Sequence, residues 1–364
     1  MGRLPVEPDK RNIGGHPHRK APMRNYIAPV LLALGFTVAA AQQPAASPPA
    51  WAYGFATPLD PNAPPVAQGR GGGGGGGAGG RGAVQQAAPD TTKRTLNGST
   101  AAFTLAQVRD GFGPADWFPG DHPAMPPVVA QGRRDAMITA CSLCHYPNGK
   151  GRPENAGVAG LPYEYFVKTM SDFKNDARKS SDTRKTNTGR MIQFAKAMTD
   201  DEIKAAATYF SSMKWAPWIK VVETDTVPKT RIAGGMFITA DGAAAGTEPI
   251  GQRIIEVPVN GEQTETLRNP RSGFIAYVPT GAIKKGEAVA TRGQCALCHG
   301  TTLQGLGPVP GIAGRSPSYM VRQMFDMQHG ARTGSWSELM RRVVGPMTSE
   351  DMLDVAAYVA SRTP

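Results

Sequence analysis

The residues of this chain best suited to chemistry form two C-x-x-C-H pentads, which contain all four of its cysteines. The first runs from Cys141 to His145 and the second from Cys295 to His299. This spacing is the attachment signature of a c-type haem, because each cysteine can form a thioether and the next histidine can bind the iron. The pattern therefore predicts two covalent haems c. Their expected attachment and metal-binding residues are Cys141, Cys144 and His145, and Cys295, Cys298 and His299.

Two C-x-x-C pairs also occur in zinc sites and in redox-active disulfides. A zinc ribbon needs its pairs close together, but 150 residues lie between Cys144 and Cys295. A thioredoxin-like site would follow a strand in a βαβ pattern, which the flanking sequence does not show. A histidine directly after both pairs favours haem attachment over either alternative.

The segments around the two pentads are copies of each other. Residues 141–178 align without a gap on residues 295–332, at an offset of 154, and the match resumes at an offset of 149. Identities extend beyond the pentads to Tyr165 with Tyr319 and to Arg178 with Arg332. We therefore predict a first haem domain over residues 100–214 and a second over residues 281–364.

Helices must position the pentads in each copy. A capping box starts a C-terminal helix at Thr199 in the first copy, and Thr348 with Asp351 does the same in the second. Further helices are expected over residues 128–140, 163–173, 284–294 and 317–327. Three short helices make a mostly α domain that is too small to be stable on its apolar core alone, so the haem must supply the rest of the core.

The sixth iron ligand decides what each haem can do. Three methionine pairs recur in both copies: Met170 with Met324, Met191 with Met340, and Met198 with Met347. The first pair has the spacing of a helix core, and the third directly precedes the capping threonine, where an apolar residue staples the helix. Met191 and Met340 each precede that threonine by eight positions, in an expected loop. They are the predicted axial ligands.

Together these motifs resemble the bacterial periplasmic class I cytochromes c of the two-haem tandem-repeat type. In that family the pentad is followed by P-x-L-A-G, a tyrosine, and a methionine upstream of a short helix start. The second copy matches with Pro310–Gly314, Tyr319 and Met340, whereas the first has Ala156 in place of the proline. The resemblance covers about 75 residues in each copy. It implies histidine and methionine ligands at both irons and an electron-transfer role without catalytic residues.

In that family a backbone carbonyl near the proline accepts the second N–H of the proximal histidine. Pro310 is the expected partner of His299, and either Pro153 or the backbone near Ala156 the expected partner of His145. This difference predicts unequal reduction potentials for the two haems.

Residues 1–41 have the pattern of a secretion signal, with Met23 as the expected start. Arg24 precedes an apolar run from Ile27 to Val38, and an A-x-A cleavage site follows before Gln42. The run is shorter than the roughly 20 residues of a membrane span, so we expect export to the periplasm and no span after cleavage. Residues 42–99 are rich in Gly, Pro and Ala and are expected to form a disordered tether.

The connector over residues 215–280 alternates like β-strands at 219–224, 252–257 and 273–278. We interpret it as a short β-rich element that braces the two haem domains, with a substrate platform as the alternative. The sequence shows no paired carboxylates and no nucleophile with a base that would favour catalysis there.

The formal net charge is +11, and removing residues 1–41, with six basic and two acidic side chains, leaves +7. A basic surface suits redox protein partners with an acidic docking face and is not a nucleic-acid signature here. Arg178 and Arg332 either pair with haem propionates or are solvated helix ends.

The predicted function is a periplasmic dihaem carrier of single electrons between a donor dehydrogenase or quinol-oxidising complex and a terminal acceptor. The alternatives are a cytochrome subunit of an alcohol or sugar dehydrogenase complex and a dihaem peroxidase.

Overall fold

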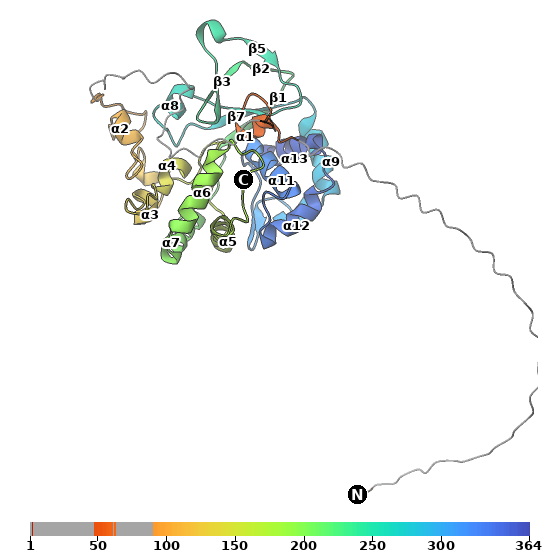
Figure 1. Ribbon diagram of the computed structural model, residues 1–364. Helices are drawn as coiled ribbons and strands as arrows, with labels where there is room; N and C mark the ends of the chain where they lie inside the picture. Colours follow the sequence, from red (N-terminus) through yellow and green to blue (C-terminus); the bar gives the residue numbers. More distant parts are fainter. Residues whose placement is uncertain (1, 3–46, 61, 63–89) are drawn as a thin grey trace, which may run out of the picture. The chain divides into compact units, whose positions relative to one another are not determined.

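The computed structural model describes residues 2, 47–60, 62 and 90–364, which are drawn in colour in Figure 1. All but one residue of the expected secretion signal, and most of the expected tether, lie outside the described residues. Among the described helices, none has both the length and the hydropathy needed to span a membrane.

The first copy is built mainly from helices. They are α2 (Leu105–Val108), α3 (Pro127–Ala130), α4 (Cys141–His145), α5 (Tyr163–Lys174), α6 (Thr186–Ala197) and α7 (Asp200–Ser211), with a 3-10 turn, η1, at Pro119–Asp121. The predicted capping box starts α7: the Glu202 amide donates to Thr199 Oγ1 at 3.2 Å, and the Thr199 amide donates to Glu202 Oε2 at 2.8 Å. Helices α5, α6 and α7 enclose an apolar cluster that includes Phe173 and Phe210.

The helix expected over residues 128–140 is wrong, because only the single turn α3 forms there. Gly132 follows it with a φ of +67°, a left-handed conformation that ends the helix. The chain then folds back, and the main chains of Arg133 and Ile138 exchange hydrogen bonds of 2.7 and 3.0 Å. The approach is so close that a Cβ at position 132 would lie 2.1 Å from the Ile138 oxygen.

The second copy repeats this order, with a longer helix before its pentad. Its elements are α9 (Ala282–Arg292), α10 (Cys295–His299), β8 (Gly305–Leu306), β9 (Val309–Pro310), α11 (Pro317–Gln328), α12 (Ser335–Val344) and α13 (Ser349–Ser361). Ser316 caps α11 with Pro317 at the first helical position, a preferred pair. Helices α9 and α13 pack closely, because Gly286 has no side chain to hold them apart.

The connector folds into strands, as its alternation predicts. They are β1 (Ile219–Glu223), β2 (Thr226–Pro228), β3 (Thr230–Ala233), β4 (Met236–Thr239), β5 (Thr247–Pro249), β6 (Ile255–Pro258) and β7 (Phe274–Val278), with the turn η2 (Gly242–Ala244) and the short helix α8 (Gly261–Glu265). In the central sheet β7 lies between β1, which is parallel to it, and β6, which is antiparallel. Strand β6 begins at Ile255, later than predicted, after a bend at Gln252.

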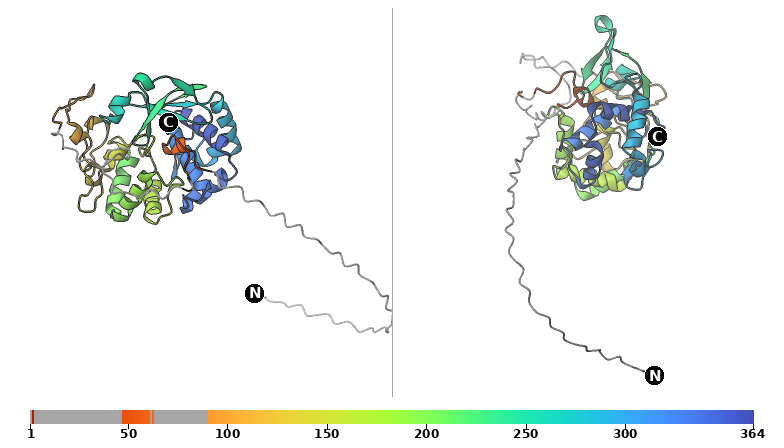
Figure 2. Two further views of the ribbon diagram at one scale, coloured as in Figure 1. Left: turned by 45° about the horizontal axis from the view of Figure 1, so that its top comes forward. Right: turned by 90° about the vertical axis from the view of Figure 1, so that its right-hand side faces the viewer.

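Strand β7 contacts both copies. In Figure 2 the connector, green to cyan, lies beside both the first copy, orange to green, and the second copy, blue. Its Phe274 packs with Tyr146 of the first copy, while Ala276 and Val278 join the core cluster of the second copy, which includes Phe325. The connector therefore packs against both haem domains, which supports the interpretation as a brace.

Residues 47–60 depart from the expected tether. They contain the helix α1 (Ala50–Tyr53), whose Tyr53 is fully buried in the core of the second copy. The Tyr53 hydroxyl donates to Asp326 Oδ1 at 2.7 Å. The high content of Gly, Pro and Ala predicts a disordered tether, but the few apolar residues of this segment pack against α11.

Candidate haem sites

Each pentad forms a short helix, α4 or α10, and each histidine contacts the backbone eleven residues further on. His145 Nδ1 lies 2.8 Å from the carbonyl oxygen of Ala156, and His299 Nδ1 lies 2.8 Å from that of Pro310. Because a carbonyl only accepts, Nδ1 carries the proton in both rings and Nε2 keeps its lone pair. Burial lowers the pKa of both histidines, against a smaller opposing effect of this hydrogen bond. Both rings are neutral and available as metal ligands.

The carbonyl that serves His145 is therefore that of Ala156, and Pro153 does not take this role. The acceptor is a main-chain atom, which any residue can supply. The equal distances in the two copies remove the missing proline as a reason for unequal reduction potentials.

The cysteines are arranged for haem attachment rather than for the alternatives. All four thiols are free. Burial raises the pKa of Cys141 to about 12 and also raises that of Cys295. No group of three or more His, Cys, Asp or Glu side chains could hold a metal ion in the described part of the chain. Cys141 and Cys295 instead border apolar clusters, a donor set and surroundings that fit a haem c.

The predicted axial methionines lie in helices, so the expected loop is wrong. Met191 is the sixth residue of α6, and Met340 is the sixth residue of α12. Both side chains are half-buried, whereas Met170 and Met198 are buried in the apolar cluster of the first copy. The equal positions in two equivalent helices are consistent with a shared role, but the ligand assignment stays a prediction.

The two pentads differ in what covers them. Leu143 is half-buried, because the Arg268 guanidinium of the connector donates to its carbonyl. Next to it, Asn148 Nδ2 donates to the Pro270 carbonyl at 2.9 Å. The equivalent Leu297 is 74% exposed. The connector thus shields the first pentad and leaves the second open to solvent.

The repeated arginines form a reciprocal contact between the copies. Arg178 Nη2 donates to the Tyr319 hydroxyl at 2.7 Å, and Arg332 Nη2 donates to the Tyr165 hydroxyl at 3.0 Å. Both arginines also donate to the side chain of Gln323, and their main chains form an antiparallel bridge. Both are buried, so the interpretation as solvated helix ends is wrong. The repeat identified these four residues, but only the fold pairs them across copies.

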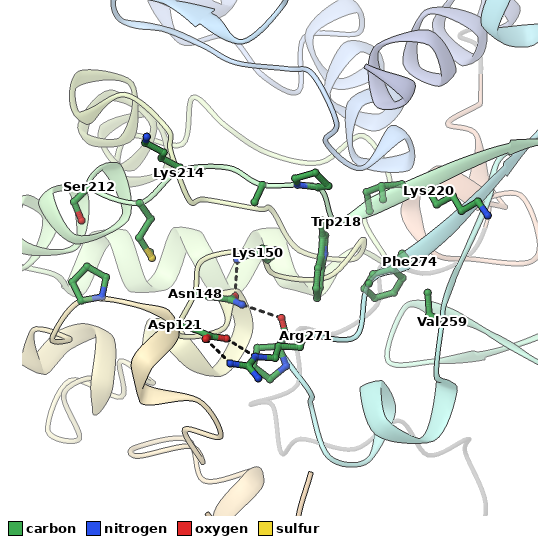
Figure 3. Close-up of a pocket in the computed structure, with 17 residues that line it drawn as sticks. Asp121, Asn148, Lys150, Ser212, Lys214, Trp218, Lys220, Val259, Arg271 and Phe274 are labelled. Carbon is green, nitrogen blue, oxygen red and sulfur yellow. Dashed lines mark hydrogen bonds and ion pairs between the residues drawn. The ribbon is translucent and has the colours of Figure 1, made fainter. Parts of the chain in front are cut away.

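A cleft of about 710 Å³ lies between the first copy and the connector (Figure 3). Trp218 and Phe274 line it, and the Lys150 ammonium lies 4.9 Å from the centre of the Trp218 ring. Its one lining carboxylate, Asp121, is held by Arg271 in two hydrogen bonds of 2.6 and 2.7 Å. The carboxylate of the cleft is therefore already paired with a cation.

Comparisons with known proteins find several cytochromes similar to this chain. The family description "Cytochrome c" matches residues 129–214. Cytochrome c-554(548) of Halomonas halodenitrificans is 37% identical over 81 residues, which is 98% of its length and 21% of this chain. The thiosulfate dehydrogenase electron acceptor of Thiomonas intermedia is 26% identical over 261 residues, 84% of its length and 68% of this chain. The solved cytochrome c4 of Acidithiobacillus ferrooxidans matches over 98% of its chain and 61% of this one, with 22% identity and a TM-score of 0.38.

The site is thus that of an electron-transfer protein with two class I haem domains in tandem, joined by a β-rich connector. The chain belongs to the cytochrome c family. It binds two haems c covalently.

Proposed function

We propose that this protein is a periplasmic carrier that takes single electrons from a donor dehydrogenase and passes them to a terminal acceptor. The observation that carries the proposal is the equivalence of the two sites, each with a neutral histidine whose Nδ1 is held at 2.8 Å by a carbonyl. The haem, when bound, supplies a reversible one-electron couple. The chain orients the imidazole through the carbonyl and surrounds the site with apolar side chains that exclude water.

Met191 and Met340 complete the proposed ligand sets. A thioether at the sixth position raises the reduction potential and blocks access of small molecules. A dihaem peroxidase needs one iron with an open position, whereas the two copies offer the same candidates at the same helix positions. This equivalence favours a carrier over a peroxidase.

A dehydrogenase is the favoured donor over a quinol-oxidising complex. One relative that aligns along most of its length is named as an electron acceptor of thiosulfate dehydrogenase. The net charge of +7 expected after export would steer the protein toward partners with an acidic face. A cytochrome subunit of an alcohol or sugar dehydrogenase complex is a second form of the same role.

The test uses the exported, haem-loaded protein. Its mass should show an N-terminus near Gln42, and the haem absorbance of the oxidised form should be followed after mixing with thiosulfate dehydrogenase and thiosulfate, with an alcohol dehydrogenase and its substrate, or with a quinol. Reduction by a dehydrogenase but not by the quinol supports the proposal. Rapid turnover of hydrogen peroxide by the reduced protein would instead establish a peroxidase.

A further inference from the structure

Side chains of the second copy form hydrogen bonds with the loop of the first copy that accepts a hydrogen bond from His145. This loop, residues 153–159, contains Ala156, whose carbonyl accepts from His145. Arg322 Nη2 donates to the Pro153 carbonyl at 2.8 Å, on one side of Ala156. Arg315 Nη1 and Nη2 donate to the Gly157 and Ala159 carbonyls at 2.9 and 3.0 Å, on the other side. Two guanidinium groups therefore fix the loop at both ends.

Both arginines are almost fully buried, with 7% of Arg315 and 5% of Arg322 exposed. Besides these two loop carbonyls, Arg315 has two further partners among the described residues: the Gly311 carbonyl, which accepts from Nε at 2.7 Å, and the Trp215 ring, 4.5 Å from its guanidinium carbon. Burial lowers the pKa of Arg315 to about 10, which leaves it charged at neutral pH. A buried cation with such partners is strongly tied to them, because water cannot replace them.

The arrangement is one-sided, although the domains are copies. The offset of 154 places Leu161 opposite Arg315 and Lys168 opposite Arg322, so the first copy has no equivalent of either arginine. The Pro310 carbonyl of the second copy lies instead on a β-hairpin of its own domain, formed by β8 and β9. The two arginines break the repeat, and that departure is the sequence signal from which they could have been found.

We infer that Arg315 and Arg322 are positioning residues through which the second domain sets the proximal ligand of the first haem. The inference rests on the proposed role of His145 as an iron ligand. A firmly held acceptor makes the imidazole more basic, and a more basic ligand stabilises the oxidised iron. Loosening the loop therefore weakens the His145 hydrogen bond and raises the reduction potential of the first haem alone.

The experiment compares Arg315→Lys with the full-length, haem-loaded wild type. Lysine keeps the positive charge but cannot fork across two carbonyls. We expect the reduction potential of the first haem to rise while that of the second stays unchanged, in a redox titration followed by NMR lines assigned to each haem. The ring N–H of His145 should also exchange faster with solvent.

Arg332→Lys is the matched control, because it disturbs the contact between the copies without touching the loop. An equal shift in this control, or unchanged potential and ring exchange in Arg315→Lys, would overturn the inference. If Arg315→Lys does not accumulate with two haems, Arg322→Lys decides in the same way. A wild-type spectrum without histidine-bound iron at the first pentad would instead refute the proposed ligand set.

Discussion

At the scale of single residues, the two haem sites differ less than their sequences do. Ala156 replaces a proline, yet its carbonyl holds His145 at the same distance as Pro310 holds His299. A main-chain acceptor is insensitive to the side chain that carries it. Side-chain ligands have no such tolerance, so the methionine assignment is where substitutions are most informative.

The first prediction concerns Met340. Met340→His should abolish about half of the methionine–iron charge-transfer band of the oxidised protein and lower one of its two reduction potentials, because a second imidazole replaces a thioether. Absorption spectroscopy and redox titration measure both effects. The first haem should be nearly unchanged.

Met324→Leu serves as the control for this prediction. Met324 packs against the apolar core of the second copy, and a swap of similar volume usually costs less than about 1.5 kcal/mol. Its band and potentials should stay as in the wild type. Loss of the band in Met324→Leu with retention in Met340→His would place the ligand on α11.

At the scale of elements, the contact between α9 and α13 depends on one missing side chain. A Cβ at position 286 would lie 1.9 Å from the Asp354 carbonyl oxygen and 2.8 Å from the Tyr358 Cβ. Helices α9 and α13 can therefore pack this closely only with glycine at position 286.

Gly286→Ala should lower the free energy of unfolding by about 1–3 kcal/mol, the usual cost of overpacking. In an exposed helix the same substitution would be stabilising by roughly 1 kcal/mol. The sign of the change in unfolding free energy therefore distinguishes overpacking from helix propensity. Chemical denaturation of the haem-loaded protein measures the change. Ala288→Gly, at an exposed position of α9, is the control and should be destabilising through propensity alone. A stabilised Gly286→Ala variant would show that the helices are not in close contact.

At the scale of the whole molecule, the connector makes the two copies unequal. Arg268 of the connector contacts the first pentad at the Leu143 carbonyl, whereas Leu297 of the second pentad is exposed. No charged residue occurs from Gly293 to Gly314, the segment that contains the second pentad. We expect a protein donor to deliver electrons there first.

Leu297→Glu should therefore slow reduction by a protein donor by about tenfold, since a charge buried in a contact costs on the order of 1.4 kcal/mol or more. Reduction by ascorbate should change little. Stopped-flow absorbance measures both rates. Met137→Glu places the same charge on an exposed apolar side chain of the first copy and should have no effect. Equal rates for all three proteins would exclude the second pentad as the point of entry.

The reciprocal contact between the copies predicts a pH dependence. Burial alone would raise the pKa of Tyr165, but the guanidinium groups of Arg332 and Arg178 lower it from 10 to about 8. The folded state then favours the tyrosinate, so its contribution to stability is full above pH 10 and is lost as the pH falls through 8.

Between about pH 8 and pH 10, the free energy of unfolding of the wild type should therefore rise relative to that of Tyr165→Phe. Denaturation at several pH values measures this difference. A difference that does not vary with pH would contradict the predicted ionisation of Tyr165.

The sequence by itself predicts the haem attachment residues and the two proximal histidines, and it determined the repeat and the capped C-terminal helices. Each of these depends on local spacing: thioether chemistry requires C-x-x-C-H, and a capping box acts within one turn. The strands of the connector were also predictable, because their alternation is local.

Only the tertiary structure decided which residues meet across the repeat. Three such contacts are the hydrogen bonds of Arg178 with Tyr319, Tyr53 with Asp326, and Arg315 with the Gly157 carbonyl. They join residues that are 141, 273 and 158 positions apart in the sequence. Such contacts arise when two domains bury their surfaces against each other, and periodicity within either domain carries no information about them.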